Sequence, residues 1–424
     1  PPQYSPSLSR YKLLYRPRRR GPAAPVPQPP LRALPPSRLD HGRHRCLMTR
    51  ELLRVAIIGC GKIADQHALA IRRSGRGALV AACDSEMLMA SQLAERFEIG
   101  AIYDSVDKML AECRPDVVHI TAPPVPHYRL GSVCLKAGCH VYIEKPFTVN
   151  TSEASALEEM ARQRGRLMIA GHNLQFTAEA LAMRRLVAAG YLGGRPVHLE
   201  RHFSYSLDDQ SYLRPVIANP DHWVRRLPGR LFHNIISHGI ASLAEFLDGE
   251  IVSLKATSHQ SERMRRLGCA DLHDELRVNL RDEHGTTAFF CFTTQAKPAL
   301  NQLRIVGPQN SLLVDFATGS LIRLSGASAK SYLTFVLPPR RLAREYAANA
   351  RRNLVDILRR RLFQDAGMGE MTAQFYRAIV DGAPSPLPMR EILLTSKIMD
   401  LIFEDLRSAD TEPAPVSASS TRAG

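Results

Sequence analysis

The sequence lacks any apolar run of the roughly 18 residues that a membrane-spanning helix needs, and it has no segment with the apolar core of a signal peptide. It also has no CxxC pair, because its eight cysteines are scattered through apolar or strand-like segments. Scattered cysteines are typical of free thiols in a reducing compartment. These absences argue against a membrane-spanning or disulfide-rich secreted protein, and we expect a cytoplasmic location.

The formal net charge of +15 suggests a nucleic-acid partner, but much of the excess lies at one end of the chain. Residues 1–50 hold ten arginines and one aspartate and are rich in proline, so we expect a disordered basic leader. The remainder has no lysine-rich tail or recognisable nucleic-acid module, so no nucleic-acid partner is expected. We hypothesise that Met48 is the natural start, the alternative being a genuine basic arm. Residues 411–424 are expected to be a disordered tail.

From residue 53, apolar segments alternate with amphipathic helical segments. The expected strands are 53–59, 78–84, 117–123, 139–145 and 167–173. Continuous apolar strands separated by such helices indicate a parallel sheet that is covered on both faces. We therefore expect an α/β domain over residues 51–172.

The pattern changes in the second half, which we assign to an α+β domain over residues 173–410. Several of its strands alternate polar and apolar residues, so one face of a large, mostly antiparallel open sheet is expected to meet solvent or a partner. The expected strands are 197–205, 251–259, 275–282, 286–294, 301–307, 311–317, 320–325 and 332–338. Helices are expected at 340–363, 369–381 and 389–406.

The segment GCGKIA follows the first expected strand and opens a helix. In this G-x-G-x-x-A pattern the first glycine permits a tight turn, the second lets backbone approach a pyrophosphate, and the third small residue allows close packing. Asp84 ends the second strand, where it can hold ribose hydroxyls and would repel a 2′-phosphate, so NAD is favoured over NADP. An ordinary glycine turn is the alternative to this Rossmann dinucleotide site. The expected cofactor-binding residues of the motif are Gly59, Cys60, Gly61, Lys62, Ile63 and Ala64.

The apolar run HVYI ends in Glu144, Lys145 and Pro146. A charged pair is costly to bury without partners, and proline cannot donate to a sheet ladder. From these residues alone, the segment is either a surface turn or a strand that delivers a lysine to a site.

Four segments resemble, in order and spacing, the glucose–fructose oxidoreductase and inositol dehydrogenase (Gfo/Idh/MocA) family: GCGKIADQHALAI, CDSEMLMASQLAERF, TAPPVPHYRLGSVCLKAGCHVYIEKPFT and GYLGGRPVHLE. The likeness covers residues 53–406. It implies that Lys145 lies beside the nicotinamide, where a cation stabilises negative charge during hydride transfer, and that the following peptide bond to Pro146 is often cis. The further cofactor contacts that it implies are Thr121, Ala122, Pro123, His127 and Glu144.

A second family signature, an Asp-x-x-x-His helix, corresponds here to RLFHNIISHGIASLAEFL, with Asn234 in place of the aspartate and His238 as the histidine. On one continuous helix these two residues share a face. The resemblance implies that His238 is the general base, a role that suits histidine near neutral pH. Lys145 and Asn234 complete the expected catalytic set, although Asn234 cannot carry charge. The alternative is that His238 is a satisfied core histidine.

The segment GHNLQF resembles a family motif in which Gln175 replaces an arginine, so Asn173 and Gln175 are expected to offer neutral donors to the substrate. His222 and Trp223 are expected to border the same pocket, with the indole as a stacking surface. The alternative is a packed tryptophan.

Arg225 or Arg226 is a candidate phosphate ligand, with a solvated arginine as the alternative. The histidines at 222, 233 and 238 lack zinc-motif spacing and have few carboxylates nearby, so no metal site is expected.

Together these features predict an NAD(P)-dependent oxidoreductase that moves hydride between nicotinamide and a hydroxyl-bearing carbon of a sugar, sugar nucleotide or cyclitol. Two alternatives stay open: an NAD-dependent glycosidase or epimerase-like enzyme with no net redox change, and a non-catalytic NAD-binding sensor or scaffold. From the resemblance we also expect a homodimer or homotetramer.

Residues 340–363 are the segment least similar to the family. A helical wheel places apolar residues on one side and arginines on the other. We expect an inserted helix that packs on the sheet and leaves a solvated arginine face; the alternative is docking to an anionic membrane surface or a polyanionic partner. The apolar residues are Leu342, Tyr346, Leu354, Ile357 and Leu358, and the arginines are Arg341, Arg344, Arg351, Arg352 and Arg359.

Overall fold

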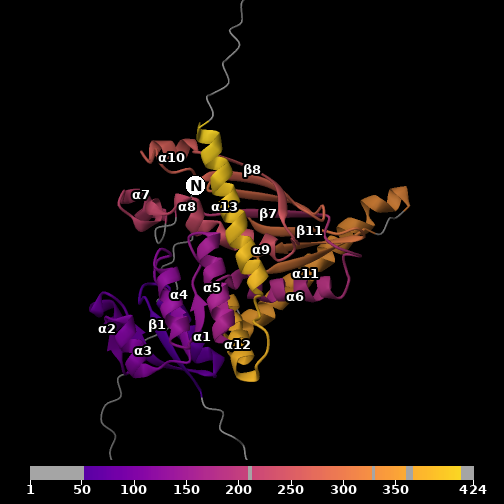
Figure 1. Ribbon diagram of the computed structural model, residues 1–424. Coiled ribbons are helices and arrows are strands. Elements are labelled where there is room, and N and C mark those ends of the chain that lie inside the picture. Colours follow the sequence, from indigo (N-terminus) through magenta and orange to yellow (C-terminus); the bar gives the residue numbers. More distant parts are fainter. Residues whose placement is uncertain (1–51, 209–212, 327–329, 360–365, 412–424) are drawn as a thin grey trace, which may run out of the picture. The chain divides into compact units, whose positions relative to one another are not determined.

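The first sheet has six parallel strands in the order β3-β2-β1-β4-β5-β6, with helices on both faces (Figure 1). The computed structural model describes residues 52–208, 213–326, 330–359 and 366–411. The expectations for the leader and for Met48 concern residues outside these ranges, as does the expectation for the tail beyond Thr411, which is the last residue of a helix. The strands are β1 (Leu53–Ile58), β2 (Gly77–Cys83), β3 (Ile102–Tyr103), β4 (Val117–Ile120), β5 (His140–Ile143) and β6 (Met168–Ala170).

The first domain contains two elements that the sequence pattern did not predict, strand β3 and helix α3. Both are short, and α3 begins where the Ser105 side chain accepts the Lys108 N–H, a local cap rather than an apolar stripe. The parallel sheet itself is confirmed. The helices are α1 (Ala64–Ser74), α2 (Met87–Phe97), α3 (Val106–Cys113), α4 (His127–Lys136) and α5 (Thr151–Arg164).

The second sheet has seven strands in the order β13-β12-β11-β7-β10-β9-β8. Only the β7–β10 pair is parallel among these described strands, so the predicted mostly antiparallel sheet is confirmed. In β7 every second side chain is buried, which places one face on a core and leaves the other partly open. The strands are β7 (His198–Ser204), β8 (Ile251–His259), β9 (Glu275–Asp282), β10 (Thr287–Thr293), β11 (Asn301–Val306), β12 (Asn310–Asp315) and β13 (Ser320–Ser325).

Short helices connect the two sheets and cover the buried face of the second one. Those described are η2 (Asn173–Phe176), α6 (Ala178–Ala188), α7 (Leu213–Ala218), η3 (Trp223–Arg226), α8 (Arg230–Ile235), α9 (Ser237–Ala244) and α10 (Glu262–Arg266).

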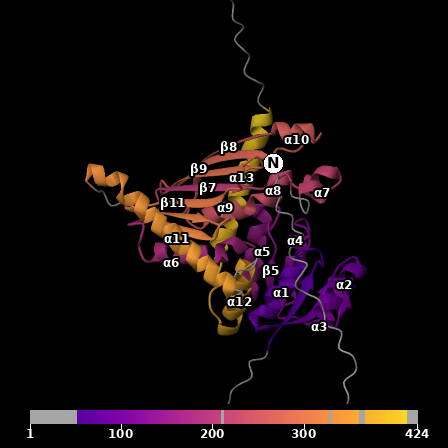
Figure 2. The same cartoon turned by 180° about the vertical axis from the view of Figure 1, so that it is seen from behind.

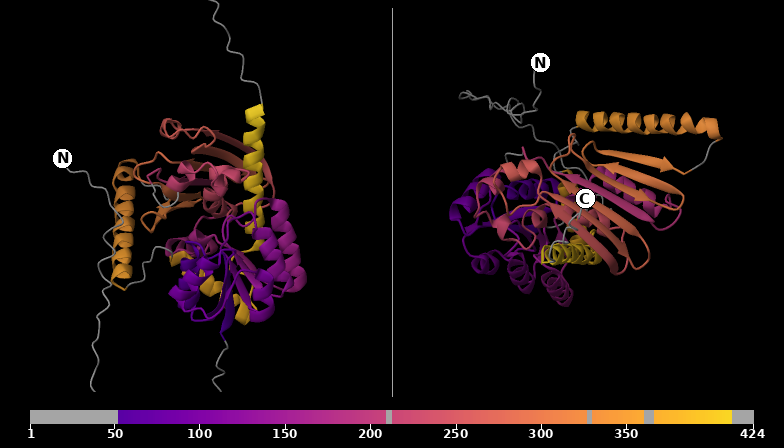
Figure 3. Two further views of the ribbon diagram at one scale, coloured as in Figure 1. Left: turned by 90° about the vertical axis from the view of Figure 1, so that its left-hand side faces the viewer. Right: turned by 90° about the horizontal axis from the view of Figure 1, so that it is seen from above.

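The strand predicted at 332–338 is wrong. The segment is a 3₁₀ turn, η4 (Ser331–Phe335), followed by helix α11 (Leu337–Leu358). Pro338 and Pro339 explain the difference, because proline fits the first turn of a helix, where no N–H bond is needed, but removes donors from a sheet. The sheet therefore ends at β13, and α11 runs along that edge (Figure 3).

The last two helices link the domains. Met371, Phe375 and Tyr376 of α12 (Ala366–Asp381) lie in the core of the first sheet, whereas Ile398 and Ile402 of α13 (Met389–Thr411) lie in the core of the second. The predicted second domain of residues 173–410 thus contains a helix that packs beside α1 in the first (Figure 1).

Candidate active site

The turn between β1 and α1 is closely packed at its first glycine and open at its second. Gly59 has a φ of 91°, and a Cβ there would lie 2.5 Å from the Ala122 backbone nitrogen. A Cβ on Gly61 would meet nothing within 4 Å. The first glycine is therefore required by the close approach of the chain after β4, and the second leaves the start of α1 open. Both features fit a dinucleotide pyrophosphate.

Asp84, at the end of β2, is tied to this turn. Its carboxylate accepts the Cys60 N–H at 2.6 Å and the Glu86 N–H at 3.0 Å. A carboxylate has about four lone-pair sites, so two backbone donors leave capacity for ribose hydroxyls. The role of Asp84 in selecting NAD stays a prediction.

The loops that follow β4 and β5 are held against each other by His127. One ring nitrogen faces the Ala122 carbonyl at 2.8 Å and the other faces the Pro146 carbonyl at 3.0 Å. The Thr121 hydroxyl donates to the Ile58 carbonyl at 3.2 Å. His127 and Thr121, predicted as cofactor contacts, thus fix the backbone on which Ala122 and Pro123 sit. The Lys145–Pro146 peptide bond is cis.

Glu144 is buried and ends a chain of three hydrogen bonds that the sequence patterns did not predict. The chain joins Tyr376 Oη to His119 Nε2 (2.8 Å), His119 Nδ1 to His67 Nδ1 (2.8 Å), and His67 Nε2 to Glu144 Oε1 (2.9 Å). All four side chains are buried. A signal was present in the sequence, because His67 lies on the apolar stripe of α1 and His119 inside an apolar strand, and such buried polar groups need partners.

The donor at the carboxylate end of this chain is fixed. An ionised Glu144 can only accept, so His67 donates from Nε2. His119 is neutral, because burial lowers its pKa well below 6.5, so its ring has one N–H for its two partners, His67 and Tyr376. Burial opposes the charge on Glu144, but the His67 hydrogen bond and the nearby Lys145 outweigh it, and the pKa of Glu144 is lowered.

Lys145 connects this chain to the second domain. Its backbone N–H donates to Glu144 Oε2 at 3.0 Å, and its Nζ donates to the Asn234 backbone carbonyl at 3.1 Å. Burial lowers the pKa of Lys145, and Glu144 opposes that shift. The strand end therefore carries a partly desolvated ammonium group to the helices that bear Asn234 and His238.

The single helix expected around Asn234 and His238 is two helices, α8 and α9, which meet at Ile236. The pKa of His238 is lowered well below 6.5, first by burial and then by Lys145 and His172. In the described part of the chain, His238 Nδ1 has no hydrogen-bond partner. Burial likewise lowers the pKa of His172, a residue that the sequence patterns did not single out, to about 4. A neutral imidazole beside an ammonium group can accept a proton from a substrate hydroxyl.

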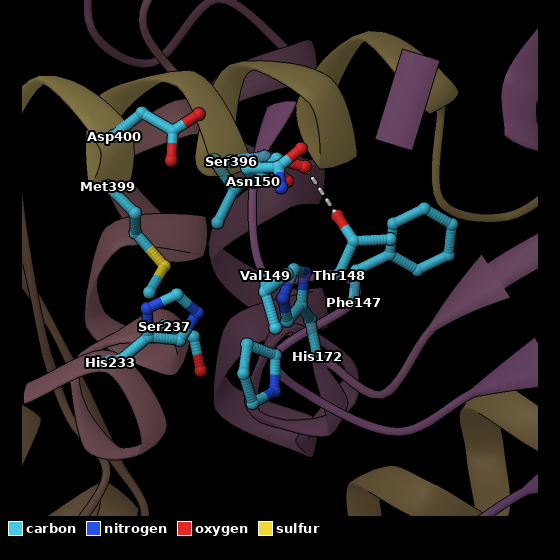
Figure 4. Close-up of a pocket in the computed structure, with 12 residues that line it drawn as sticks. Phe147, Thr148, Val149, Asn150, His172, His233, Ser237, Ser396, Met399 and Asp400 are labelled. Carbon is cyan, nitrogen blue, oxygen red and sulfur yellow. Dashed lines mark hydrogen bonds between the residues drawn. The ribbon is translucent and has the colours of Figure 1, made fainter. Parts of the chain in front are cut away.

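A small cavity lies beneath this region, where the loop after β5 meets α8, α9 and α13 (Figure 4). His172, His233 and Ser237 line it, and its volume is about 10 Å³. A volume of this size holds at most about one water molecule. The cavity therefore belongs to the packing between the domains and does not accommodate a sugar.

Three of the four residues predicted to contact substrate, Gln175, His222 and Trp223, have side-chain partners or packing within the chain. The Gln175 amide donates to Glu245 at 3.0 Å and to Glu391 at 3.2 Å, so the donors expected to meet a substrate are engaged by carboxylates. Asn173 opens η2, and its backbone carbonyl faces Gly367 of α12.

Trp223 packs against the second core, and its ring centroid lies 5.5 Å from that of His222. Arg225 is held by the Val216 carbonyl at 3.0 Å and by Asp271 at 2.7 Å. Arg226 donates to the Asp221 carbonyl at 2.9 Å. The structure thus gives both candidate phosphate ligands local roles.

Within the described ranges, no group of three histidine, cysteine or carboxylate side chains is arranged to hold a metal ion. In the same part of the chain, no helix is long and apolar enough to cross a bilayer. The described cysteines are all free and buried.

The glycine turn, the acidic end of β2 and the crossing order of the first sheet define a dinucleotide-binding protein of the Rossmann class. Residues 53–172 match the family model "Oxidoreductase family, NAD-binding Rossmann fold", and residues 180–313 match "GFO/IDH/MocA C-terminal domain". The chain belongs to the Gfo/Idh/MocA family, and NAD is the cofactor of its first domain, as the sequence predicted.

Among curated proteins, the chain is 36% identical to D-glucoside 3-dehydrogenase of Escherichia coli over 147 residues, which is 34% of this chain and 42% of that protein. It is 34% identical to UDP-N-acetylglucosamine 3-dehydrogenase of Acidithiobacillus ferrooxidans over 148 residues, 35% of this chain and 44% of that protein. The matches thus span less than half of these relatives' length.

Solved structures share the fold over more of the chain. The UDP-N-acetylglucosamine 3-dehydrogenase from Acidithiobacillus ferrooxidans aligns with a TM-score of 0.64 and 20% identity, covering 84% of this chain and 99% of that one. The WlbA dehydrogenase from Bordetella pertussis, solved with NADH and UDP-GlcNAcA, aligns with a TM-score of 0.65 and 16% identity, covering 85% and 97%.

Proposed function

We propose that this protein is an NAD-dependent dehydrogenase that oxidises a secondary hydroxyl of a sugar, sugar nucleotide or cyclitol. The observation that carries the proposal is the contact of Lys145 Nζ with the Asn234 carbonyl at 3.1 Å. Through it the end of β5 meets the helix pair that bears His238. The names of the two curated relatives, both sugar 3-dehydrogenases, support a carbohydrate substrate.

The Gly59–Ala64 turn and Asp84 would hold the cofactor, and its nicotinamide, when bound, would accept the hydride. Lys145 would hydrogen-bond the reacting hydroxyl and stabilise the negative charge that develops on its oxygen. His238 is neutral near pH 7, because burial and Lys145 lower its pKa, and its Nδ1 has no hydrogen-bond partner among the described residues. It would therefore take the hydroxyl proton, and the same pKa shift makes it a weaker base than a free imidazole. Asn234 would orient this arrangement and carry no proton.

Glu144 has a supporting role in this proposal. One oxygen accepts from His67 and the other from the Lys145 backbone, at 2.9 and 3.0 Å. A carboxylate held at both oxygens cannot rotate away, and its charge opposes the loss of a proton from the neighbouring ammonium group. Glu144 therefore positions Lys145 and helps to keep it charged.

The test is an NADH-forming assay with a panel of glucosides, UDP-sugars and inositols. Lys145→Met and His238→Ala should each lower turnover by about a hundredfold or more, while NAD binding survives His238→Ala. Lys255→Met and His284→Ala change more exposed side chains and serve as matched controls. Near-normal turnover in His238→Ala would remove that residue from the mechanism.

The same assay separates net oxidation from an internal redox cycle. A dehydrogenase releases NADH in proportion to product, whereas a glycosidase or epimerase-like enzyme converts substrate with tightly retained NAD and no NADH release. Retained NAD without conversion of any substrate in the panel would favour a sensor.

A further inference from the structure

Helix α11 contacts the rest of the protein through polar side chains. Asn349 is buried, accepts the Leu321 N–H at 3.1 Å and donates to the Leu321 carbonyl at 2.9 Å. Glu345 pairs with Arg323 of β13 at 2.6 Å, and Asn353 donates to the Thr318 carbonyl at 2.8 Å. The side of α11 that faces the sheet edge is thus a hydrogen-bonded seam, and Figure 2 shows the helix lying along that edge.

The expected helix that packs on the sheet and leaves a solvated arginine face is found, because α11 packs against edge strand β13 and its arginines are exposed. Most of its large apolar residues, however, also face outward. Tyr346 is 54% exposed, Leu354 57%, Ile357 57% and Leu358 75%. Phe335, just before the helix, is 84% exposed. The seam explains the difference, because its buried amide and ion pair fix the rotation of the helix and turn the apolar stripe to the outside. Several large apolar side chains exposed on one helix form a candidate interaction surface.

Arginines flank this stripe on the exposed side of the helix. Its two carboxylates, Glu345 and Asp356, are partly buried, and Glu345 is paired with Arg323. A cleft of about 470 Å³ between α6 and α11 adds Arg185 and Arg352 to the same basic region. The exposed arginines of the helix are Arg340, Arg341, Arg344, Arg351 and Arg359.

From this combination we propose that α11 docks this protein on an anionic phospholipid membrane. A helix with an apolar stripe beside an arginine-rich face lies in the lipid interface, with its apolar side chains among acyl chains and its arginines at phosphate groups. Each arginine near an anionic surface strengthens the attraction of the helix to the membrane. A second copy of the chain is disfavoured as the occupant, because two arginine-rich faces would repel each other. The surface lies on the second domain and does not depend on the proposed catalytic residues.

Vesicle co-sedimentation of the full chain tests the proposal. Binding to phosphatidylcholine vesicles that contain a third of phosphatidylglycerol should exceed binding to pure phosphatidylcholine by at least about tenfold and should weaken in high salt. The double variant Leu354→Glu/Ile357→Glu should abolish binding, and Arg344→Gln/Arg351→Gln should reduce it several-fold. Leu88→Glu is the matched control, because Leu88 is 68% exposed on α2, and it should bind like the wild type.

Circular dichroism and NAD binding establish that the variants are folded, since both pairs of substitutions lie on the exposed side of α11. Equal binding to neutral and anionic vesicles, or no binding, would overturn the proposal. It would also be overturned if Leu354→Glu/Ile357→Glu converted a dimer to a monomer in sedimentation velocity while vesicle binding persisted, because α11 would then be a contact between copies.

Discussion

Replacing Tyr376 by phenylalanine removes one oxygen from the buried chain that ends at Glu144. The hydroxyl lies 2.8 Å from His119 Nε2, and both side chains have no exposed surface. Without it, His119 Nε2 is a buried polar atom that lacks a hydrogen-bond partner, which typically costs about 1–3 kcal/mol. The aromatic ring stays in place, so packing changes little. We expect the free energy of unfolding to fall by about 1–3 kcal/mol.

Tyr142→Phe is the matched control for this prediction. Tyr142 is also fully buried, and its ring stacks on His119 with a centroid distance of 4.6 Å. Its hydroxyl, however, has no hydrogen-bond partner among the residues that the structure describes. Deleting an unpartnered buried hydroxyl should leave the free energy of unfolding unchanged or raise it.

Urea unfolding, monitored by circular dichroism, measures the free energy of unfolding of the wild type and of both variants. The slope of this free energy against urea concentration must be the same in all three proteins. Two tyrosine hydroxyls in one core, one bonded and one not, should then differ in sign or by at least about 1 kcal/mol. Equal losses in the two variants would refute the donor chain. An unchanged stability of Tyr376→Phe would mean that the chain does not end at α12.

Three further predictions concern cofactor choice, the site geometry and pH. Asp84→Ala should lower NAD affinity more than NADP affinity in equilibrium binding, and tighter binding of NADP by the wild type would contradict the assignment. Gly171→Ala places a Cβ 2.8 Å from Glu144 Oε1 and 3.0 Å from the Lys145 nitrogen, so the carboxylate and the lysine backbone must shift and turnover should fall by up to about a hundredfold. Gly100→Ala, with nothing within 4 Å of the added Cβ, should leave turnover unchanged. Burial lowers the pKa of His172 and of His233 from 6.5 to about 4. Between pH 6.5 and pH 4 the unfolded chain therefore binds more protons at these histidines than the folded protein does. Above pH 6.5 these histidines should cost no free energy of unfolding, and towards pH 4 that free energy should fall by about 1 kcal/mol per pH unit for each histidine. Urea unfolding that shows no such loss over this range would contradict the burial of the two rings.

Much of the fold could be predicted because its signals are local. The apolar strands of the first sheet, the glycine turn at Gly59 and the alternation in β7 depend on residues close together in sequence. The same holds for the cofactor end of the site, since Gly59, Gly61 and Asp84 follow directly from strand ends. Where a local rule was overlooked, as with Pro338 and Pro339, the predicted strand was wrong.

Contacts between distant segments could not be predicted in this way. The chain from Tyr376 to Glu144 joins α12, β4, α1 and β5, and nothing near Tyr376 in sequence indicates that it reaches His119. The motif around Gln175 predicted that its amide donates to a substrate. In the structure the amide donates to Glu245, at the C-terminal end of α9, and to Glu391 of α13.

Helix α11 shows the same division most clearly. Its amphipathic period is readable from sequence, because 3.6 residues per turn place the apolar side chains on one side. Which side meets the sheet is not readable, because that depends on Asn349 and Glu345 finding Leu321 and Arg323 on β13. In the folded protein, Asn349 is buried and bonded to both backbone groups of Leu321, so the polar side of the helix meets the sheet and most of the apolar side chains stay exposed.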